Sequence, residues 1–198
     1  MQKTVTRARQ AITELAAQYI AENSLISYHT AKRKAADQLG FKQKDLPTNI
    51  EIERAVISYQ KLFQNSFQTE ELFKLRTTAV NVMRLFEHFD PRLVGSVLAG
   101  TAGSQSEIIV HLFSDNPEAI SARLMENNIP YKNSERRIRI ANKTTVTFPA
   151  YCFLAGEMFV VLVLFPEKYL KQEPICPIEE KPMKRANIKK AQSLIQES

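Results

Sequence analysis

Hydrophobic and polar positions follow a helical period through the first ninety residues. Near the N-terminus, one apolar stripe follows the spacing of a helix with a single buried face. It consists of Ile12, Leu15, Ala16, Tyr19 and Ile20. A second helix is expected from Tyr28 to Leu39, because Gly40 directly after it is the residue that most often ends a helix.

Two further helices are expected before residue 90. One follows Pro47, where Thr48 and Glu51 have the spacing of a capping box, in which each side chain binds the other residue's backbone N–H. Its apolar stripe consists of Ile52, Val56, Tyr59, Phe63 and Phe67. The other is expected to open at Thr69.

After Pro91 the pattern changes to short apolar runs, which predict strands. These runs cover residues 92–98, 107–113, 136–140, 144–153 and 158–165, and a helix ending near Glu126 interrupts them. The run 158–165 (MFVVLVLF) has no polar alternation, so it is expected to be a central strand covered on both faces. Alternation in 136–140 (RRIRI) places Ile138 and Ile140 on one face and Arg137 and Arg139 on the other.

These elements predict an α+β fold with three parts. Residues 1–90 form a helical region, and residues 91–168 form a small mixed-sheet domain. Residues 169–198 form a linker containing prolines and a short basic helix, expected from Arg185 to Gln196.

Composition narrows the classes of function. The chain has 198 residues, of which 44% are hydrophobic, and its longest apolar run of eight residues is too short to cross a bilayer. Two cysteines cannot build a disulfide framework, so a reduced, cytoplasmic protein without a membrane partner is expected. The net charge of +6 is spread along the chain and gives a mild attraction for nucleotides or nucleic acid.

One segment carries a recognisable signature. Gly95 and Ser96 are followed by ten residues, and then by Glu107 at the start of a hydrophobic strand. This pattern resembles the signature of the nucleotidyltransferase superfamily that includes DNA polymerase β. The whole chain resembles an uncharacterised group of bacterial nucleotidyltransferase-like proteins, through the segments AKRKAADQLG, LPTNIEIE, SEIIVHLF and PMKRA.

The resemblance implies a specific chemistry. In this superfamily three acids on neighbouring strands hold two Mg²⁺ ions, and the Gly-Ser turn approaches a nucleoside triphosphate. Here Glu107 occupies the first acid position, but Ile109 stands at the second. The third should lie in the run 158–165, which has no acid, and Val161 is the matching position. At most one of three metal-binding carboxylates remains, so a pseudoenzyme is expected.

Other polar residues admit two interpretations each. His111 could act as a general base or metal ligand beside Glu107, or could be a hydrogen-bonded histidine that fills a vacated cleft. Arg136, Arg137 and Arg139 could bind phosphates, or could be charges on a solvated strand edge.

Three functions follow. The leading hypothesis is a catalytically degenerate member that binds a nucleotide, RNA or a protein partner, with Gly95 and Ser96 as the phosphate-binding turn. The second is an active enzyme that uses Mg²⁺ and a nucleoside triphosphate at an atypical site around Glu107 and His111, with Glu51 or Glu53 as further acid donors. The third is a purely structural interaction protein.

Overall fold

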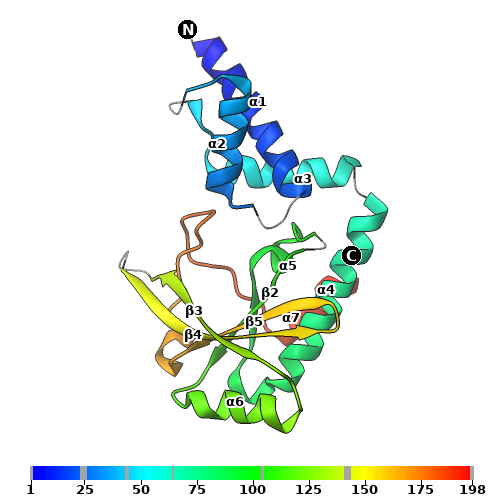
Figure 1. The fold of residues 1–198 in the computed structure, drawn as a ribbon, viewed down its shortest axis with the longest axis vertical. Coiled ribbons are helices and arrows are strands. Elements are labelled where there is room, and N and C mark those ends of the chain that lie inside the picture. The colour runs from blue at the N-terminus through cyan, green and yellow to red at the C-terminus, as the bar shows by residue number, and fades with distance from the viewer. Residues whose placement is uncertain are drawn as a thin grey trace. The chain divides into compact units, whose positions relative to one another are not determined.

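The computed structural model describes residues 2–196, apart from 23–25, 43–44, 64, 104 and 141–143. For residues 2–6, 60–63 and 65–68 it describes the backbone alone, so the predicted stripe positions Phe63 and Phe67 lie outside the described side chains. The described residues form an α+β protein with seven α-helices and a five-stranded mixed sheet (Figure 1). None of the described helices is both long and apolar enough to cross a membrane.

The chain divides into two compact units. The first consists of residues 1–71 with 100–105, and the second consists of residues 72–99 with 106–198.

Three helices build the first unit: α1 (Gln2–Glu22), α2 (Tyr28–Leu39) and α3 (Asn49–Phe63). Gly40 ends α2 in the left-handed conformation with φ of 71°, as the sequence predicts. A shared core, largely of small and branched side chains, joins the three helices. Its buried members are Ile12, Ala16, Ala17, Ile20, Ala31, Ala35, Ala36, Ile52 and Val56.

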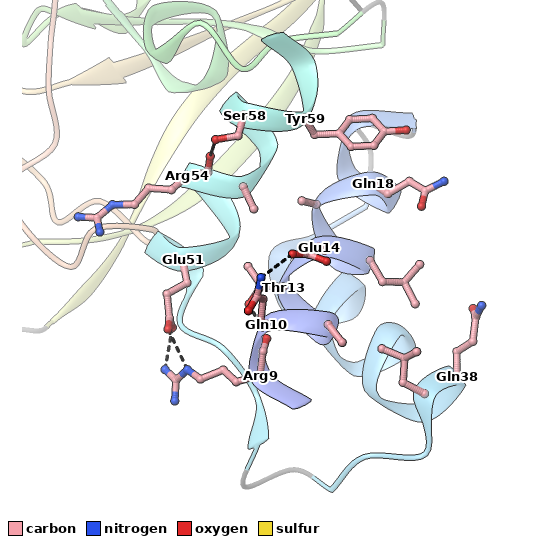
Figure 2. A pocket seen from close by; sticks show the side chains of 15 residues that line it. Arg9, Gln10, Thr13, Glu14, Gln18, Gln38, Glu51, Arg54, Ser58 and Tyr59 are labelled. Carbon is pink, nitrogen blue, oxygen red and sulfur yellow. Dashed lines mark hydrogen bonds and ion pairs between the residues drawn. The ribbon is translucent and has the colours of Figure 1, made fainter. Parts of the chain in front are cut away.

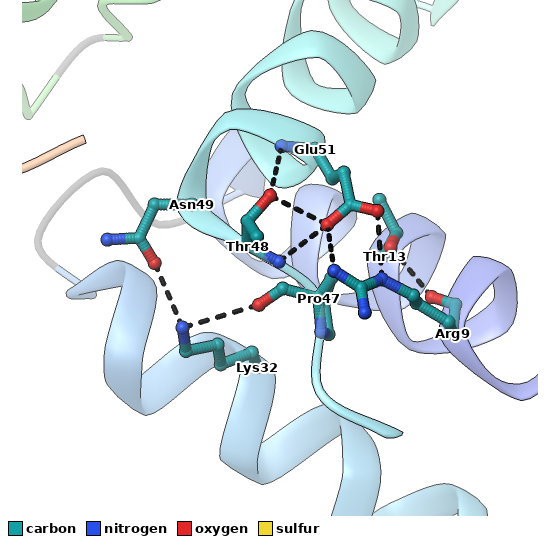
Figure 3. Close-up of polar contacts among 7 residues, drawn as sticks. All are labelled: Arg9, Thr13, Lys32, Pro47, Thr48, Asn49 and Glu51. Carbon is teal, nitrogen blue, oxygen red and sulfur yellow. Dashed lines mark hydrogen bonds and ion pairs between the residues drawn. The ribbon is translucent and has the colours of Figure 1, made fainter. Parts of the chain in front are cut away.

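The predicted capping box is present at the start of α3 (Figure 3). The backbone N–H of Thr48 donates to the Glu51 carboxylate over 2.6 Å, and the Glu51 N–H donates to the Thr48 hydroxyl over 3.3 Å. The same carboxylate accepts two hydrogen bonds from the Arg9 guanidinium on α1, at 2.7 and 2.8 Å. Glu51 therefore ties the start of α3 to α1.

Helix α4 (Asn65–Leu85) begins four residues before the predicted Thr69. Its residues up to Glu71 belong to the first unit, and those from Leu72 onward belong to the second.

The second unit is built on a sheet with the strand order β1-β2-β5-β4-β3. The strands are β1 (Arg92–Val94), β2 (Ile108–Phe113), β3 (Lys132–Arg139), β4 (Thr145–Ala155) and β5 (Met158–Phe165). Strands β2 and β5 pair in parallel, whereas the other neighbours are antiparallel. The prediction that 158–165 is a central strand with two covered faces is confirmed, since Val160 to Phe165 are all buried.

Side chains that are paired across strands share a face of the sheet. Phe113, Val163 and Phe148 lie on one face, in a core cluster with Phe165. Tyr169 packs on this face through edge contacts with Phe148 and Phe165, and it belongs to the 3₁₀ helix η3 (Glu167–Leu170) that follows β5.

The opposite face of the central strands is equally buried. It carries Ile108, Val110, Leu112, Val160, Leu162 and Leu164. On this side of β4, the Tyr151 hydroxyl donates to the carbonyl of Pro117, the first residue of α6 (Pro117–Glu126). The Arg123 guanidinium of α6 in turn donates to the carbonyl of Leu85, at the end of α4.

Three further predicted elements were wrong in extent by three residues or more. Strand β3 begins at Lys132, four residues before the predicted run 136–140. The strand expected over 92–98 ends at Val94, because Gly95 takes a φ of +75° that no strand can hold, and α5 (Gly95–Ala99) follows. The closing helix α7 (Ile188–Gln196) begins three residues after Arg185, since Ala186 pairs with Leu93 of β1 as an isolated bridge. The alternation predicted for β3 is confirmed, because Ile138 and Ile140 pack against the core cluster.

The hydrogen bonds of Glu51 with Arg9 and Thr48 give a first prediction. Hydrogen bonds from Arg9 hold the pKa of Glu51 at about 2, below its ordinary 4.5. The carboxylate therefore stabilises the fold above pH 4.5, and this stability is lost as the pH falls toward 2. Glu51→Gln keeps a capping-box side chain but removes the charge, and Glu51→Ala removes both. We expect losses of about 0.5 and about 1–1.5 kcal/mol at pH 7 in urea denaturation, after allowance for solvent screening.

Equal stability of the native chain and Glu51→Gln at pH 7 would contradict this prediction. So would a difference between them that persists undiminished down to pH 2.

Candidate functional site

The Gly-Ser turn lies beside the position that should hold the second acid. Val94 pairs with Ile109 at the end of β1, and Gly95 then turns the chain into α5. A Cβ added to Gly95 would lie 3.6 Å from the Cδ1 atom of Ile109. The first and middle parts of the sequence signature are therefore neighbours in space.

The third position joins them through strand pairing. In the parallel ladder between β2 and β5, Ile109 lies opposite Val161, the residue matched from the sequence. Val161 is fully buried and belongs to the core cluster that Ile109 packs against. The two positions where the resemblance implies carboxylates thus hold adjoining aliphatic side chains.

Glu107 stands directly before β2 and has a cationic partner. The Nη2 atom of Arg136 donates to both of its carboxylate oxygens, at 3.0 and 3.1 Å. Both side chains keep about a third of their surface exposed, 35% for Glu107 and 36% for Arg136. The guanidinium compensates the negative charge of this carboxylate without a metal ion.

The described residues contain no group of three or more His, Cys, Asp or Glu side chains arranged to hold a metal ion. Glu51 and Glu53 both have partners within the first unit. Glu51 binds Arg9 and Thr48, and Glu53 accepts a hydrogen bond from the Tyr28 hydroxyl.

His111 is buried on the apolar face of the sheet, with 2% of its surface exposed. Its Nδ1 atom accepts a hydrogen bond of 3.3 Å from the Nε–H of Arg185, and its ring lies 4.6 Å from that of Phe165. Burial, reinforced by the positive charge of Arg185, lowers the pKa of His111 to about 3. The imidazole is therefore neutral at pH 7, and its Nδ1 lone pair is already occupied.

Arg185 is the residue of this region that the sequence did not single out. It follows the sheet by twenty residues, yet its guanidinium lies 4.9 Å from the Phe113 ring centre and 5.2 Å from that of Phe165. Its Nη1 atom donates to the Tyr169 carbonyl over 2.9 Å, while its Nη2 atom is buried and has no hydrogen-bond partner among the described residues. Burial lowers the pKa of Arg185 to about 10, so it remains charged. In the sequence it looked like one of several basic residues near the C-terminus.

The three arginines of β3 do not form one cluster. Arg137 and Arg139 pair with Thr147 and Thr145, whereas Arg136 pairs with Phe148 and so lies on the other face. Arg136 alone reaches Glu107.

Two basic residues of α2 make contacts within the first unit. Lys32 donates to the Asn49 side chain over 3.0 Å and to the Pro47 carbonyl over 3.4 Å (Figure 3). The ammonium of Lys34 lies 4.5 Å from the ring centre of Tyr19. These contacts stabilise the helical unit, while Arg33 and Lys34 both remain exposed.

The first unit also has a groove that the sequence did not reveal. It has a volume of about 950 Å³ and lies along α1 and α3 (Figure 2). Its lining combines polar residues of both helices with stripe residues such as Leu15 and Tyr59, so no single sequence pattern marks it.

In comparisons with known proteins, no family model, curated protein or solved structure matches the chain.

The buried His111 gives a prediction about pH. Between pH 6.5 and about pH 3, the unfolded chain binds a proton at this imidazole and the folded chain does not. Stability should therefore fall with decreasing pH across this window, by up to about 1.4 kcal/mol per pH unit. His111→Gln should have a shallower pH dependence, measured by urea denaturation at several pH values.

NMR titration of the His111 ring provides a direct check. An imidazole that titrates near pH 6.5 in the folded protein would contradict the assignment.

Gly95 gives a second prediction for this region. Alanine in the left-handed conformation of Gly95 is strained, although its Cβ would make only an ordinary contact with Ile109. We expect Gly95→Ala to lose about 1–2 kcal/mol of unfolding free energy, and Gly95→Asn to lose less because asparagine tolerates this conformation. An alanine variant as stable as the native chain would show that the turn adopts another conformation.

Proposed function

We propose that the chain is a nucleotidyltransferase-like protein that has lost metal-dependent transfer and acts as a binding module. The observation that carries this proposal is the pairing of Ile109 with Val161 beside the Gly95 turn. Gly95, Ile109 and Val161 are neighbours, and the aliphatic side chains at the two paired positions have no oxygen that could hold Mg²⁺.

The state of Glu107 supports the same proposal. A single carboxylate is a weak Mg²⁺ ligand, and this one is already paired with Arg136. A metal ion would have to displace the guanidinium and would still lack its other protein ligands. The loss of these ligands removes the charge stabilisation on which phosphoryl chemistry depends.

An active site built around Glu107 and His111 is disfavoured by the position of the histidine. A general base or metal ligand needs an available lone pair, and the Nδ1 lone pair of His111 accepts a hydrogen bond from Arg185. With a pKa of about 3, the imidazole is also a weak base at pH 7.

The ligand of the module is proposed as a nucleotide, an RNA or a protein. Exposed apolar side chains near the vacated acid positions favour a partner with an apolar surface: Leu154 and Phe159 are cross-strand neighbours, and they are 64% and 40% exposed.

Calorimetric titration tests the binding part of the proposal. ATP, GTP, CTP and UTP are each titrated into the protein with and without Mg²⁺, and a mixed-sequence RNA oligonucleotide follows. Nucleotide binding should be unchanged when Mg²⁺ is omitted, because Ile109 and Val161 cannot bind the ion. Glu107→Ala should retain it within about threefold, since no metal ligand is lost.

A nucleotide-incorporation assay tests the inactive part. Labelled nucleoside triphosphate with Mg²⁺ should give no transfer to RNA or protein acceptors, and Mg²⁺-dependent transfer that Glu107→Ala abolishes would refute the proposal. If no nucleotide and no RNA binds, the protein-partner form of the proposal remains. In that case Phe159→Asp should weaken capture of the partner. Phe73→Asp, which changes a separate exposed aromatic residue on α4, should leave that capture unchanged.

A further inference from the structure

The groove along α1 and α3 combines an apolar floor with polar walls. Ala11 and Leu15 of α1 and Ala55 of α3 are partly buried and line the floor. Small side chains at facing positions leave room between the helices, which is why a volume of about 950 Å³ remains there (Figure 2).

Each wall of the groove is a ridge of residues spaced by four. Gln10, Glu14 and Gln18 form the ridge on α1, and Arg54 and Ser58 form the ridge on α3. Ridges with this spacing are the ones that interdigitate when helices of two layers pack together.

The charges on the two walls are opposite and uncompensated. Glu14 accepts a hydrogen bond of 3.0 Å from the Gln10 amide, but it has no cationic partner among the described residues. Arg54 is exposed, and its guanidinium has no carboxylate partner in the described part of the chain. Figure 2 shows that Arg54 extends from α3 away from α1, so the two charges of one chain do not meet.

The other charged residues of the lining, Arg9 and Glu51, neutralise each other in a bidentate pair. The lining as a whole therefore has two positive and two negative side chains. A groove without net charge does not favour a polyanion such as RNA, whose binding needs an excess of Lys and Arg.

We propose that this groove is a self-association surface, occupied by the α1–α3 face of a second copy of the chain. A two-fold axis through the groove places Glu14 of each copy against Arg54 of the other. The dimer then contains two such pairs, and each of the four charges has one partner. Such an isologous contact needs a self-complementary surface, and an unpaired negative charge on α1 with an unpaired positive charge at the outer side of α3 provides it. The α1 and α3 helices of the two copies then form a four-helix layer.

The polar walls indicate a reversible dimer. Glu14 and Arg54 lie at the rim of the floor, where pairing adds specificity more than affinity. The dimer should therefore depend on protein concentration and on ionic strength.

Sedimentation velocity of the full chain tests the proposal over about 1 µM to about 1 mM protein. Glu14→Arg and Arg54→Glu each replace two attractive pairs with two repulsive ones, so each should raise the dimer dissociation constant at least about tenfold. The double variant restores opposite charges with exchanged positions, and its dissociation constant should return to within about threefold of the native value.

Two reversals outside the groove provide matched controls. Arg33→Glu on α2 and Glu87→Arg after α4 change the same charges at exposed positions that do not line the groove, and they should leave the dimer unchanged. Circular dichroism verifies that each variant is folded. If a reversal fails to fold, Glu14→Gln and Arg54→Gln take its place, each with an expected weakening of about threefold.

The outcomes separate clearly. A chain that remains monomeric up to about 1 mM overturns the proposal. A dimer that ignores both single variants, responds equally to the control reversals, or is not restored in the double variant also overturns it, because another surface must then hold the copies together.

Discussion

Parallel pairing of β2 with β5 is the constraint on which the sheet unit depends. Both strands are buried on both faces, so a shift of one residue would exchange the two sets of side chains and misplace every contact. This fixed register sets Ile109 against Val161 and His111 against Val163. It also determines which side chains of the sheet Tyr169 and Arg185 cover.

An aliphatic pair at this point changes how the unit is stabilised. Two buried carboxylates would repel each other and would need a cation to compensate them. Val161 instead belongs to the core, and the partly buried Ile109 packs against it. Both stabilise the unit by removing apolar surface from water, at roughly 1.5–3 kcal/mol for a fully buried side chain such as Val161. Glu107, at the solvated margin, forms an ion pair with Arg136.

Local signals in the sequence predicted local structure well. The spacing of Thr48 and Glu51 predicted the capping box, and the unbroken run 158–165 predicted the central strand, because both depend on near neighbours. The strand over 92–98 was wrong because its apolar letters suit a strand and a short helix equally, and the conformation of Gly95 decides. Arg185 and the α1–α3 groove could not be predicted, since burial of the first and the shape of the second arise from segments distant in the chain.

Arg76 shows what such distant partnerships require of a growing chain. Arg76 is buried on α4, and its guanidinium donates to the carbonyl of Val97 at 3.3 Å and to that of Leu194 at 2.8 Å. It therefore supplies a hydrogen-bond donor to a carbonyl in the last turn of α5 and to one in the last turn of α7. The second partner lies 118 residues further along the chain. During synthesis, this guanidinium therefore gains its second partner only after residue 194 has left the ribosome, so the second unit cannot complete its folding before that point.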